Sequence, residues 1–221
     1  MFASEDRPFM TIERHTLRGQ VQKDFKLPYL RYVPAQFWET PDATYPLVLW
    51  LHDADLRGND LTMLQEDVAL RFWREESDQA VIVVAPQCPA YDDWGIQQEA
   101  LDALLHDPVA MRGVDPRRRW LFGVGMGSVG AVRLAYRHPD DFAAMVLIGG
   151  MGELDFIAHL SHIPLWIFHG LLDEAPREHA EALYNAHGSA RLTTFSLSRR
   201  DLWAEMILQT TILEWLGAQT K

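Results

Sequence analysis

A glycine-rich turn between a strand pattern and a helix pattern constrains the fold of this chain more than any other feature. Trp120–Phe122 is a short apolar run, the turn Gly123–Gly127 reads Gly-Val-Gly-Met-Gly, and Val129–Arg137 has helical apolar spacing. Strands joined through helices in this way pair in parallel, and their sheet is covered by helices on both faces. The segment therefore predicts an α/β fold.

Short apolar runs recur along the whole chain and alternate with helical patterns. Several are almost unbroken, as expected for strands that are buried on both faces. The expected strands are Thr11–Thr16, Leu30–Val33, Leu47–Leu51, Val81–Ala85, Trp120–Phe122, Ala144–Ile148, Leu165–Phe168 and Leu192–Ser196. The expected helices are Trp94–Leu105, Val129–Arg137, Arg177–Ala186 and Leu202–Leu216.

These patterns predict one domain over residues 1–221, with a mostly parallel eight-stranded sheet and helices on both faces. The first two strands have no helical pattern between them, so an antiparallel edge is expected there. Only Met151–Ile163 separates two of the later strands, so no large lid is expected.

Composition narrows the classes of partner. The formal net charge is −11 over 221 residues, which disfavours nucleic acid and anionic lipid surfaces. Cys88 is the single cysteine, so no internal disulfide can form. The start of the chain lacks a signal-peptide pattern and no apolar run reaches about 20 residues, so a cytoplasmic protein that does not contact membranes is expected.

Four segments carry a family resemblance, and they follow one another in the family's order. They are Leu47–Asp60, Val81–Pro89, Val114–Gly127 and Pro164–Asp173. With them, the chain resembles the α/β-hydrolases, in particular small carboxylesterases of the polyhydroxybutyrate-depolymerase-like type. The resemblance implies the fold described above and a Ser, Asp and His triad in that chain order.

The triad that the resemblance implies is degenerate in this chain. The nucleophilic serine of the Gly-x-Ser-x-Gly turn falls on Gly125, which has no side chain. The triad acid falls on Asp173, and the histidine position falls on Arg200. A guanidinium stays protonated and cannot act as a general base near neutrality. We expect Asp173 and Arg200 to form an ion pair that fills the former triad site.

The oxyanion loop implied by the resemblance also departs from the pattern. His52 is followed by Asp53, where the family has glycine, and Met126 is the second oxyanion position. A carboxylate at residue 53 would repel a developing oxyanion unless it faced away.

Other residues near the turn could replace the missing serine nucleophile or the missing histidine base. Ser128 could serve as a displaced nucleophile, but its place favours a small residue that caps backbone N–H groups in the first helical turn. His52 and His169 end apolar strands, which favours scaffold histidines over a relocated base. The single Cys88 follows an apolar run and is typical of a buried hydrophobe.

The polar and aromatic residues near the turn suggest a pocket without a metal. The carboxylates that could gather at the strand ends are Asp53, Asp55, Asp60 and Asp173. Their spacing does not match a calcium loop, and the histidines and the cysteine lack zinc spacing, so neither metal nor cofactor is expected. Trp94, Trp203 and Met126 are candidates for an apolar pocket wall.

Three functions remain open at this stage, because a fold does not determine a function. The favoured one is a non-hydrolytic pseudo-esterase that binds a small molecule in the vestigial cleft, or acts as a subunit in a homo-oligomer or with a partner. The second is a repurposed enzyme for a cyclisation, isomerisation or lyase reaction. The third is a carboxylesterase-type hydrolase with displaced catalytic residues.

Overall fold

A single seven-stranded sheet organises the residues that the computed structural model describes, which are 24–173, 175 and 177–221. The strand order is β1-β3-β2-β4-β5-β6-β7, and all neighbours are parallel except β1, which is antiparallel to β3. The strands are β1 Tyr29–Tyr32, β2 Tyr45–Leu51, β3 Ile82–Pro86, β4 Val114–Val124, β5 Ala144–Ile148, β6 Leu165–Gly170 and β7 Arg191–Phe195. The additional strand expected at Thr11–Thr16 lies outside the described residues.

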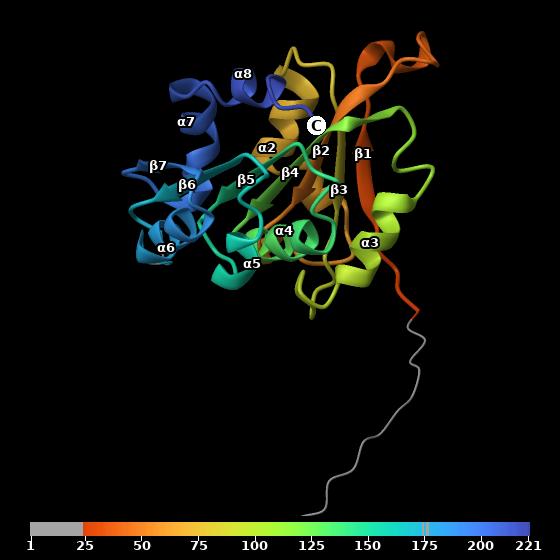
Figure 1. Cartoon of the computed structure of the whole chain (residues 1–221). Helices are drawn as coiled ribbons and strands as arrows, with labels where there is room; N and C mark the ends of the chain where they lie inside the picture. Colours follow the sequence, from red (N-terminus) through yellow and green to blue (C-terminus); the bar gives the residue numbers. More distant parts are fainter. Residues whose placement is uncertain (1–23, 174, 176) are drawn as a thin grey trace, which may run out of the picture.

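Helices cover both faces of the sheet (Figure 1). One face carries α3 Gln98–His106, α4 Met126–Arg137, α5 Leu154–Ala158 and α6 Arg177–His187. The other carries α1 Thr62–Gln65, α2 Val68–Arg71, a π turn at Phe72–Glu76, α7 Leu202–Gln209 and α8 Ile212–Gly217. Between β5 and β6 the only helix of the described chain is the short α5, in agreement with the expected lack of a large lid.

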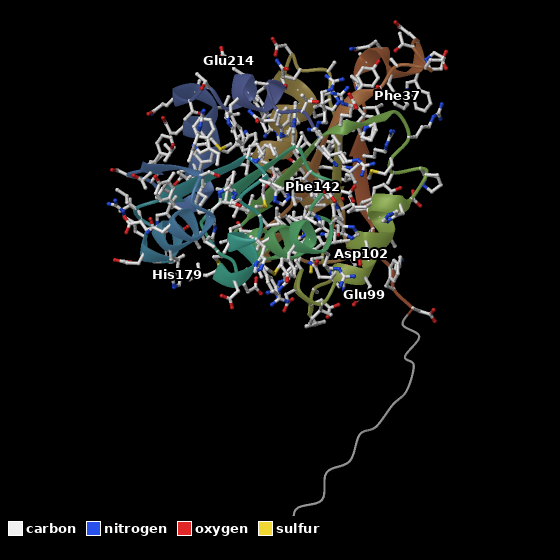
Figure 2. All side chains as sticks on the ribbon, in the orientation of Figure 1. Phe37, Glu99, Asp102, Phe142, His179 and Glu214 are labelled. Atoms are coloured by element: carbon white, nitrogen blue, oxygen red, sulfur yellow. The ribbon has the colours of Figure 1, made fainter. Side chains whose placement is uncertain are left out.

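Alternation along β2 divides the core in two. Leu47, Leu49 and Leu51 pack under the α4 face, whereas Val48 and Trp50 pack under the α7 face. All seven residues of β2 are buried, as a central parallel strand requires. Figure 2 shows side chains filling the space on both sides of the sheet, with Phe142 inside the body of the molecule.

Two helix predictions were wrong in their bounds. The helix expected at Trp94–Leu105 begins at Gln98, because residues 94–97 form turns. The pattern at Leu202–Leu216 is two helices, because Thr210 takes extended backbone angles (φ −127°, ψ 165°) between α7 and α8. Apolar spacing continues across both places, so periodicity alone does not reveal the breaks.

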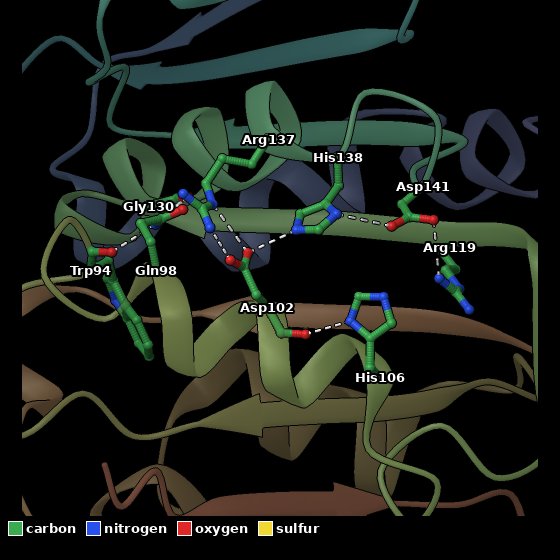
Figure 3. A network of polar contacts seen from close by, with 9 residues as sticks. All are labelled: Trp94, Gln98, Asp102, His106, Arg119, Gly130, Arg137, His138 and Asp141. Carbon is green, nitrogen blue, oxygen red and sulfur yellow. Dashed lines mark hydrogen bonds and ion pairs between the residues drawn. The ribbon is translucent and has the colours of Figure 1, made fainter. Parts of the chain in front are cut away.

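A polar network fastens α3 to the end of α4, away from the glycine turn (Figure 3). The carboxylate of Asp102 binds the guanidinium of Arg137 and lies 2.7 Å from Nε2 of His138. The other ring nitrogen of His138 lies 3.5 Å from Asp141, which also pairs with Arg119. These contacts join α3 to α4, and α4 itself packs on β4.

Four strands end at the same edge of the sheet, and their following residues converge there. Asp53 follows β2, Gly125 follows β4, Asp173 follows β6 and Arg199 follows β7. Ligands of open parallel sheets bind outside the carboxyl ends of the strands. No helix in the described part of the chain combines the length and apolarity needed to cross a bilayer.

Candidate functional site

The glycine turn between β4 and α4 is sharp. Gly125 has φ 51° and ψ −112°, a positive-φ conformation that favours glycine. Gly127 lies so close to β2 that a β-carbon on it would be 1.9 Å from the carbonyl oxygen of Leu51. The turn therefore brings the first residues of α4 directly against the end of β2.

The side chain of Asp53 fills the space above Gly125. A β-carbon placed on Gly125 would lie 2.2 Å from Oδ1 of Asp53 and 2.7 Å from Oδ2. Real β-carbons do not approach other atoms so closely. A serine at residue 125 and the carboxylate of Asp53 in this position therefore exclude each other.

Two backbone N–H groups hold the Asp53 carboxylate. Oδ1 accepts hydrogen bonds from the N–H of Ala54 at 2.7 Å and from the N–H of Met126 at 2.9 Å. The N–H that follows the nucleophile and an N–H of the loop after an earlier strand form the oxyanion hole in α/β-hydrolases. The N–H groups of Ala54 and Met126 have the places in the chain that correspond to these donors, and the Asp53 carboxylate faces them rather than pointing away.

Arg199 neutralises Asp53 on its other oxygen. Nη2 of Arg199 lies 2.8 Å from Oδ2 of Asp53, and Nη1 lies 3.5 Å from Oδ1 of Asp173. The three side chains are 20%, 17% and 5% exposed for Arg199, Asp53 and Asp173 respectively, so solvent screens these contacts only in part. One guanidinium thus links the loop after β2 to the loop after β6.

Arg199, the neighbour of the expected Arg200, approaches Asp173. A 3₁₀ turn over Arg199–Asp201 begins directly after the loop that follows β7. Sequence reasoning did not single out Arg199 at this position. The side chain of Arg200 lies outside the described residues, so the expected ion pair between Asp173 and Arg200 stays a prediction.

His52 supports the backbone and is not available as a base. Its Nε2 accepts the N–H of Cys88 at 3.0 Å, so Nδ1 carries the proton and donates to the carbonyl oxygen of Asp53 at 2.6 Å. Burial lowers the pKa of His52 to about 4. The Cys88 thiol is buried as well, and burial raises its pKa to about 12. Neither group is poised for catalysis near neutrality.

Ser128 and His169 are also enclosed. The hydroxyl of Ser128 is buried and lies 2.9 Å from the carbonyl oxygen of Gly123 and 3.3 Å from that of Ile148. It therefore faces carbonyl groups rather than capping N–H groups as expected. His169 is 1% exposed inside β6, and burial lowers its pKa. No general base contacts Ser128 in the described chain.

Comparisons with known proteins identify the fold of this chain. No protein-family model matches the sequence, and no curated protein is significantly similar to it. Among solved structures, a thermostable esterase superposes with a TM-score of 0.77 at 25% identity, over 88% of this chain and 60% of that one. The chain has the α/β-hydrolase fold. It spans 60% of the length of this thermostable esterase.

Two further α/β-hydrolase structures have lower identity and support the fold alone. Esterase PE8 superposes with a TM-score of 0.65 at 21% identity, over 87% of this chain and 100% of that one. An S-formylglutathione hydrolase from Agrobacterium tumefaciens gives a TM-score of 0.62 at 14% identity, over 88% and 90%.

Two cavities flank the Asp53–Arg199 ion pair of this α/β-hydrolase fold. The first, here called the Trp203 cavity, measures about 270 Å³ and is lined by Trp203, Trp50 and Asp67 among others. The second, here called the Met126 cavity, measures about 550 Å³ and is lined by Met126, Trp94 and Arg133 among others. Asp53 and Arg199 line both cavities. The ion pair therefore stands between them.

The tryptophans expected at the pocket lie on different sides of the ion pair. Trp203 packs edge-on against Trp50, with ring centroids 5.3 Å apart. Trp94 is fully buried, and its Nε1 donates to the carbonyl oxygen of His52 at 2.9 Å. Trp94 therefore stabilises the loop after β2 in addition to lining the Met126 cavity.

The four aspartates that were considered as metal ligands do not gather at one point. Asp53 is engaged as described, Asp55 lines the Trp203 cavity, and Asp60 accepts the N–H of Thr62 at the exposed surface. Within the described ranges, no three His, Cys, Asp or Glu side chains come together as a metal site would require.

Sequence reasoning missed Arg199 and Asp67. The signal for Arg199 was the adjacent Arg-Arg pair after the last strand. Asp67 is the N-cap of α2, which is a common structural role for aspartate. The sequence therefore contained no sign that Asp67 also lines the Trp203 cavity.

Proposed function

We propose that this α/β-hydrolase-fold protein is a non-hydrolytic pseudo-esterase that binds a small molecule in the cleft around the Asp53–Arg199 ion pair. One observation carries the proposal. The carboxylate of Asp53 sits on the N–H groups of Ala54 and Met126, where an esterase stabilises its tetrahedral intermediate.

The occupied N–H groups act against acyl transfer in two ways. An incoming substrate carbonyl would have to displace a carboxylate that is also held by Arg199 at 2.8 Å. Removal of a single oxyanion donor costs an enzyme about 10²–10³ in rate, and here both donors are engaged. Gly125 offers no nucleophile to attack the carbonyl.

The alternatives have less support. A displaced hydrolase would need Ser128, but that hydroxyl is buried and faces carbonyl groups. A repurposed enzyme that worked at the turn would need Asp53 or His52 as its acid or base. Asp53 is engaged by two N–H groups and a guanidinium, and His52 is held neutral by burial. Ligand binding requires none of these groups to react.

The test is ester turnover by the purified protein combined with labelling by a fluorophosphonate probe. We expect p-nitrophenyl acetate and butyrate to be hydrolysed no faster than in buffer, and no covalent label on the protein. Native mass spectrometry of the same preparation would reveal a retained ligand.

A matched variant makes the test specific. The Ser128→Ala variant removes the candidate nucleophile that directly follows the turn. Turnover or labelling of the wild-type protein that disappears in Ser128→Ala would contradict the proposal and favour the displaced hydrolase. Activity that persists unchanged in the variant would indicate a contaminant or another nucleophile, which mass mapping of the label would distinguish.

The proposal also includes the cytoplasmic location expected from the sequence, and either a homo-oligomer or a partner subunit as its assembly. Fractionation of cells that contain the tagged protein tests the location. Light scattering of the purified protein tests the assembly.

A further inference from the structure

The lining of the Trp203 cavity carries more negative than positive charge. Arg199 is its one permanently cationic residue among the described residues, and Asp53 and Asp173 already hold that guanidinium. Its carboxylates come from Asp53, Asp55, Glu66 and Asp67. A ligand that brings a positive charge would be favoured here by simple electrostatics.

Asp67 is half-buried and lines this cavity. Its Oδ1 accepts the N–H groups of Ala69 and Leu70, each at 3.1 Å, and so caps α2. Its Oδ2 has no hydrogen bond or ion pair within the described chain. Burial raises the pKa of Asp67, and the nearby Asp55 carboxylate raises it further. A cation that donated a hydrogen bond to Oδ2 would offset both effects.

The remainder of the cavity wall is apolar and aromatic. Trp50 and Trp203 meet edge to face, and Leu56, Val68 and Ile148 complete much of the surface. Indole rings attract cations through their faces as well as burying hydrocarbon. At about 270 Å³ the cavity is slightly smaller than the usual pocket for a drug-sized ligand, so its occupant is small.

We propose that the Trp203 cavity binds a small primary ammonium compound with an aromatic or aliphatic body. The ammonium donates a hydrogen bond to Oδ2 of Asp67 and lies near the carboxylate of Asp55. The body packs against Trp50 and Trp203. A primary ammonium fits better than a quaternary one, because it can donate a hydrogen bond to Oδ2 of Asp67. The net charge of −11 also attracts cations to the molecule.

This inference deepens the proposed function and rests on it. The experiment is isothermal titration calorimetry of the full-length protein with three probes of matched shape: 2-phenylethylammonium, 2-phenylethanol and 3-phenylpropionate. We expect the ammonium to bind at least about 10-fold more tightly than the alcohol, as a charge-assisted hydrogen bond permits, and the carboxylate to bind most weakly.

Charge-removing variants locate the site. Asp67→Asn keeps the oxygen that caps α2 but loses the charge, so it should fold and bind the ammonium about 10-fold more weakly. Asp55→Asn should weaken binding by a smaller factor. Asp42→Asn removes the same charge from an exposed loop before β2 and should leave the affinity unchanged. If Asp67→Asn failed to fold, the affinities of Asp55→Asn and Asp42→Asn for the ammonium could still be compared, and a loss in Asp55→Asn alone would support the site.

The outcomes separate this inference from the proposed function. Equal binding of ammonium and alcohol, preference for the carboxylate, no binding at all, or insensitivity to both Asp67→Asn and Asp55→Asn would each overturn the ammonium site. Binding of the alcohol or the carboxylate in the cleft would leave the pseudo-esterase proposal standing. Ester turnover with serine labelling would overturn the proposed function whatever the calorimetry gave.

Discussion

A β-carbon on Gly125 and the carboxylate of Asp53 compete for one small volume. The two residues are 72 positions apart in the chain, yet a side chain on the first would overlap the second at 2.2 Å. At the residue scale, the lack of a side chain at residue 125 and the position of the Asp53 carboxylate therefore depend on each other. We expect that a serine placed at residue 125 alone would not create an esterase site.

The Gly125→Ser variant tests this coupling. We expect no ester hydrolysis and a loss of about 2–4 kcal/mol in the free energy of unfolding, from positive-φ strain plus the overlap with Asp53. Urea denaturation measures the loss.

Gly188→Ser is the matched control, because Gly188 also has positive φ (78°) but open space around its position. It should show the backbone strain alone, about 1–2 kcal/mol. In a double-mutant cycle, Asp53→Gly should remove the excess cost of Gly125→Ser. Equal losses in Gly125→Ser and Gly188→Ser would show that Asp53 does not occupy the space.

Asp53→Ala exposes an anion site. The N–H groups of Ala54 and Met126 and the guanidinium of Arg199 would lose their shared partner, which costs about 1–3 kcal/mol. Added formate should bind in place of the carboxylate and raise the melting temperature of the variant in a concentration-dependent way. Chloride at the same ionic strength is the control. Stabilisation of the wild-type protein by formate to the same extent would contradict this prediction.

His52 makes stability depend on pH. Its pKa is about 4 in the folded protein against an ordinary value of 6.5, so between these pH values the unfolded chain binds more protons. The contribution of neutral His52 to the free energy of unfolding is therefore fully present above pH 6.5, and it is lost as the pH falls toward 4. At pH 5 the loss is about 2 kcal/mol.

The comparison of His52→Asn with the surface variant His159→Gln isolates this contribution. Urea denaturation at pH 7.5 and pH 5 should show a smaller pH-dependent loss in His52→Asn than in the wild-type protein. His159→Gln should retain the wild-type loss. The same pH dependence in wild type and His52→Asn would exclude the assigned role.

At the element scale, the start of α4 depends on its contact with β2. The helix packs most closely against β2 at Gly127, where a β-carbon would lie 1.9 Å from the carbonyl oxygen of Leu51. This contact is between backbones and cannot be relieved by a rotamer change. It fixes the position of the Met126 N–H, which donates a hydrogen bond to Oδ1 of Asp53.

Gly127→Ala should therefore lower the free energy of unfolding by about 3 kcal/mol or more. Gly217→Ala is the control of the same chemistry, because the space around Gly217 at the end of α8 is open. It should leave stability unchanged or raise it slightly through helix propensity. Similar effects of the two variants in thermal denaturation would show that α4 and β2 are less closely packed.

The sequence predicted the elements of the described sheet because buried parallel strands are unbroken apolar runs. It did not predict that β4 starts at Val114, because Pro116 and the arginines after it interrupt the apolar run. It also did not predict the break at Thr210. Tertiary contacts decide such bounds, and local apolar spacing does not contain them.

At the scale of the whole molecule, the chain order of the motifs was sufficient to predict the fold and to bring Gly125, Asp53, Met126 and Asp173 to one edge. It was not sufficient to predict how their charges pair. The direction of the Asp53 side chain and the contacts of Arg199 with both Asp53 and Asp173 depend on distances between four loops. No pattern within one segment encodes these distances.

The ion pair also organises the molecule's binding surface. Because Asp53 and Arg199 line both cavities, they separate an acidic, tryptophan-walled cavity from a larger one beside Met126. In the proposed complex, a ligand in the Trp203 cavity would leave the hydrogen bonds from Ala54 and Met126 to Asp53 in place. The hydrolase scaffold would serve here as a rigid frame for recognition.

The most direct test of the central claim is a crystal structure of the wild-type protein that resolves the Asp53 carboxylate. Our account predicts one carboxylate oxygen within hydrogen-bond distance of the N–H groups of Ala54 and Met126, and the guanidinium of Arg199 on the other oxygen. Asp53 turned away from Met126, with water or a ligand on those two N–H groups, would contradict it.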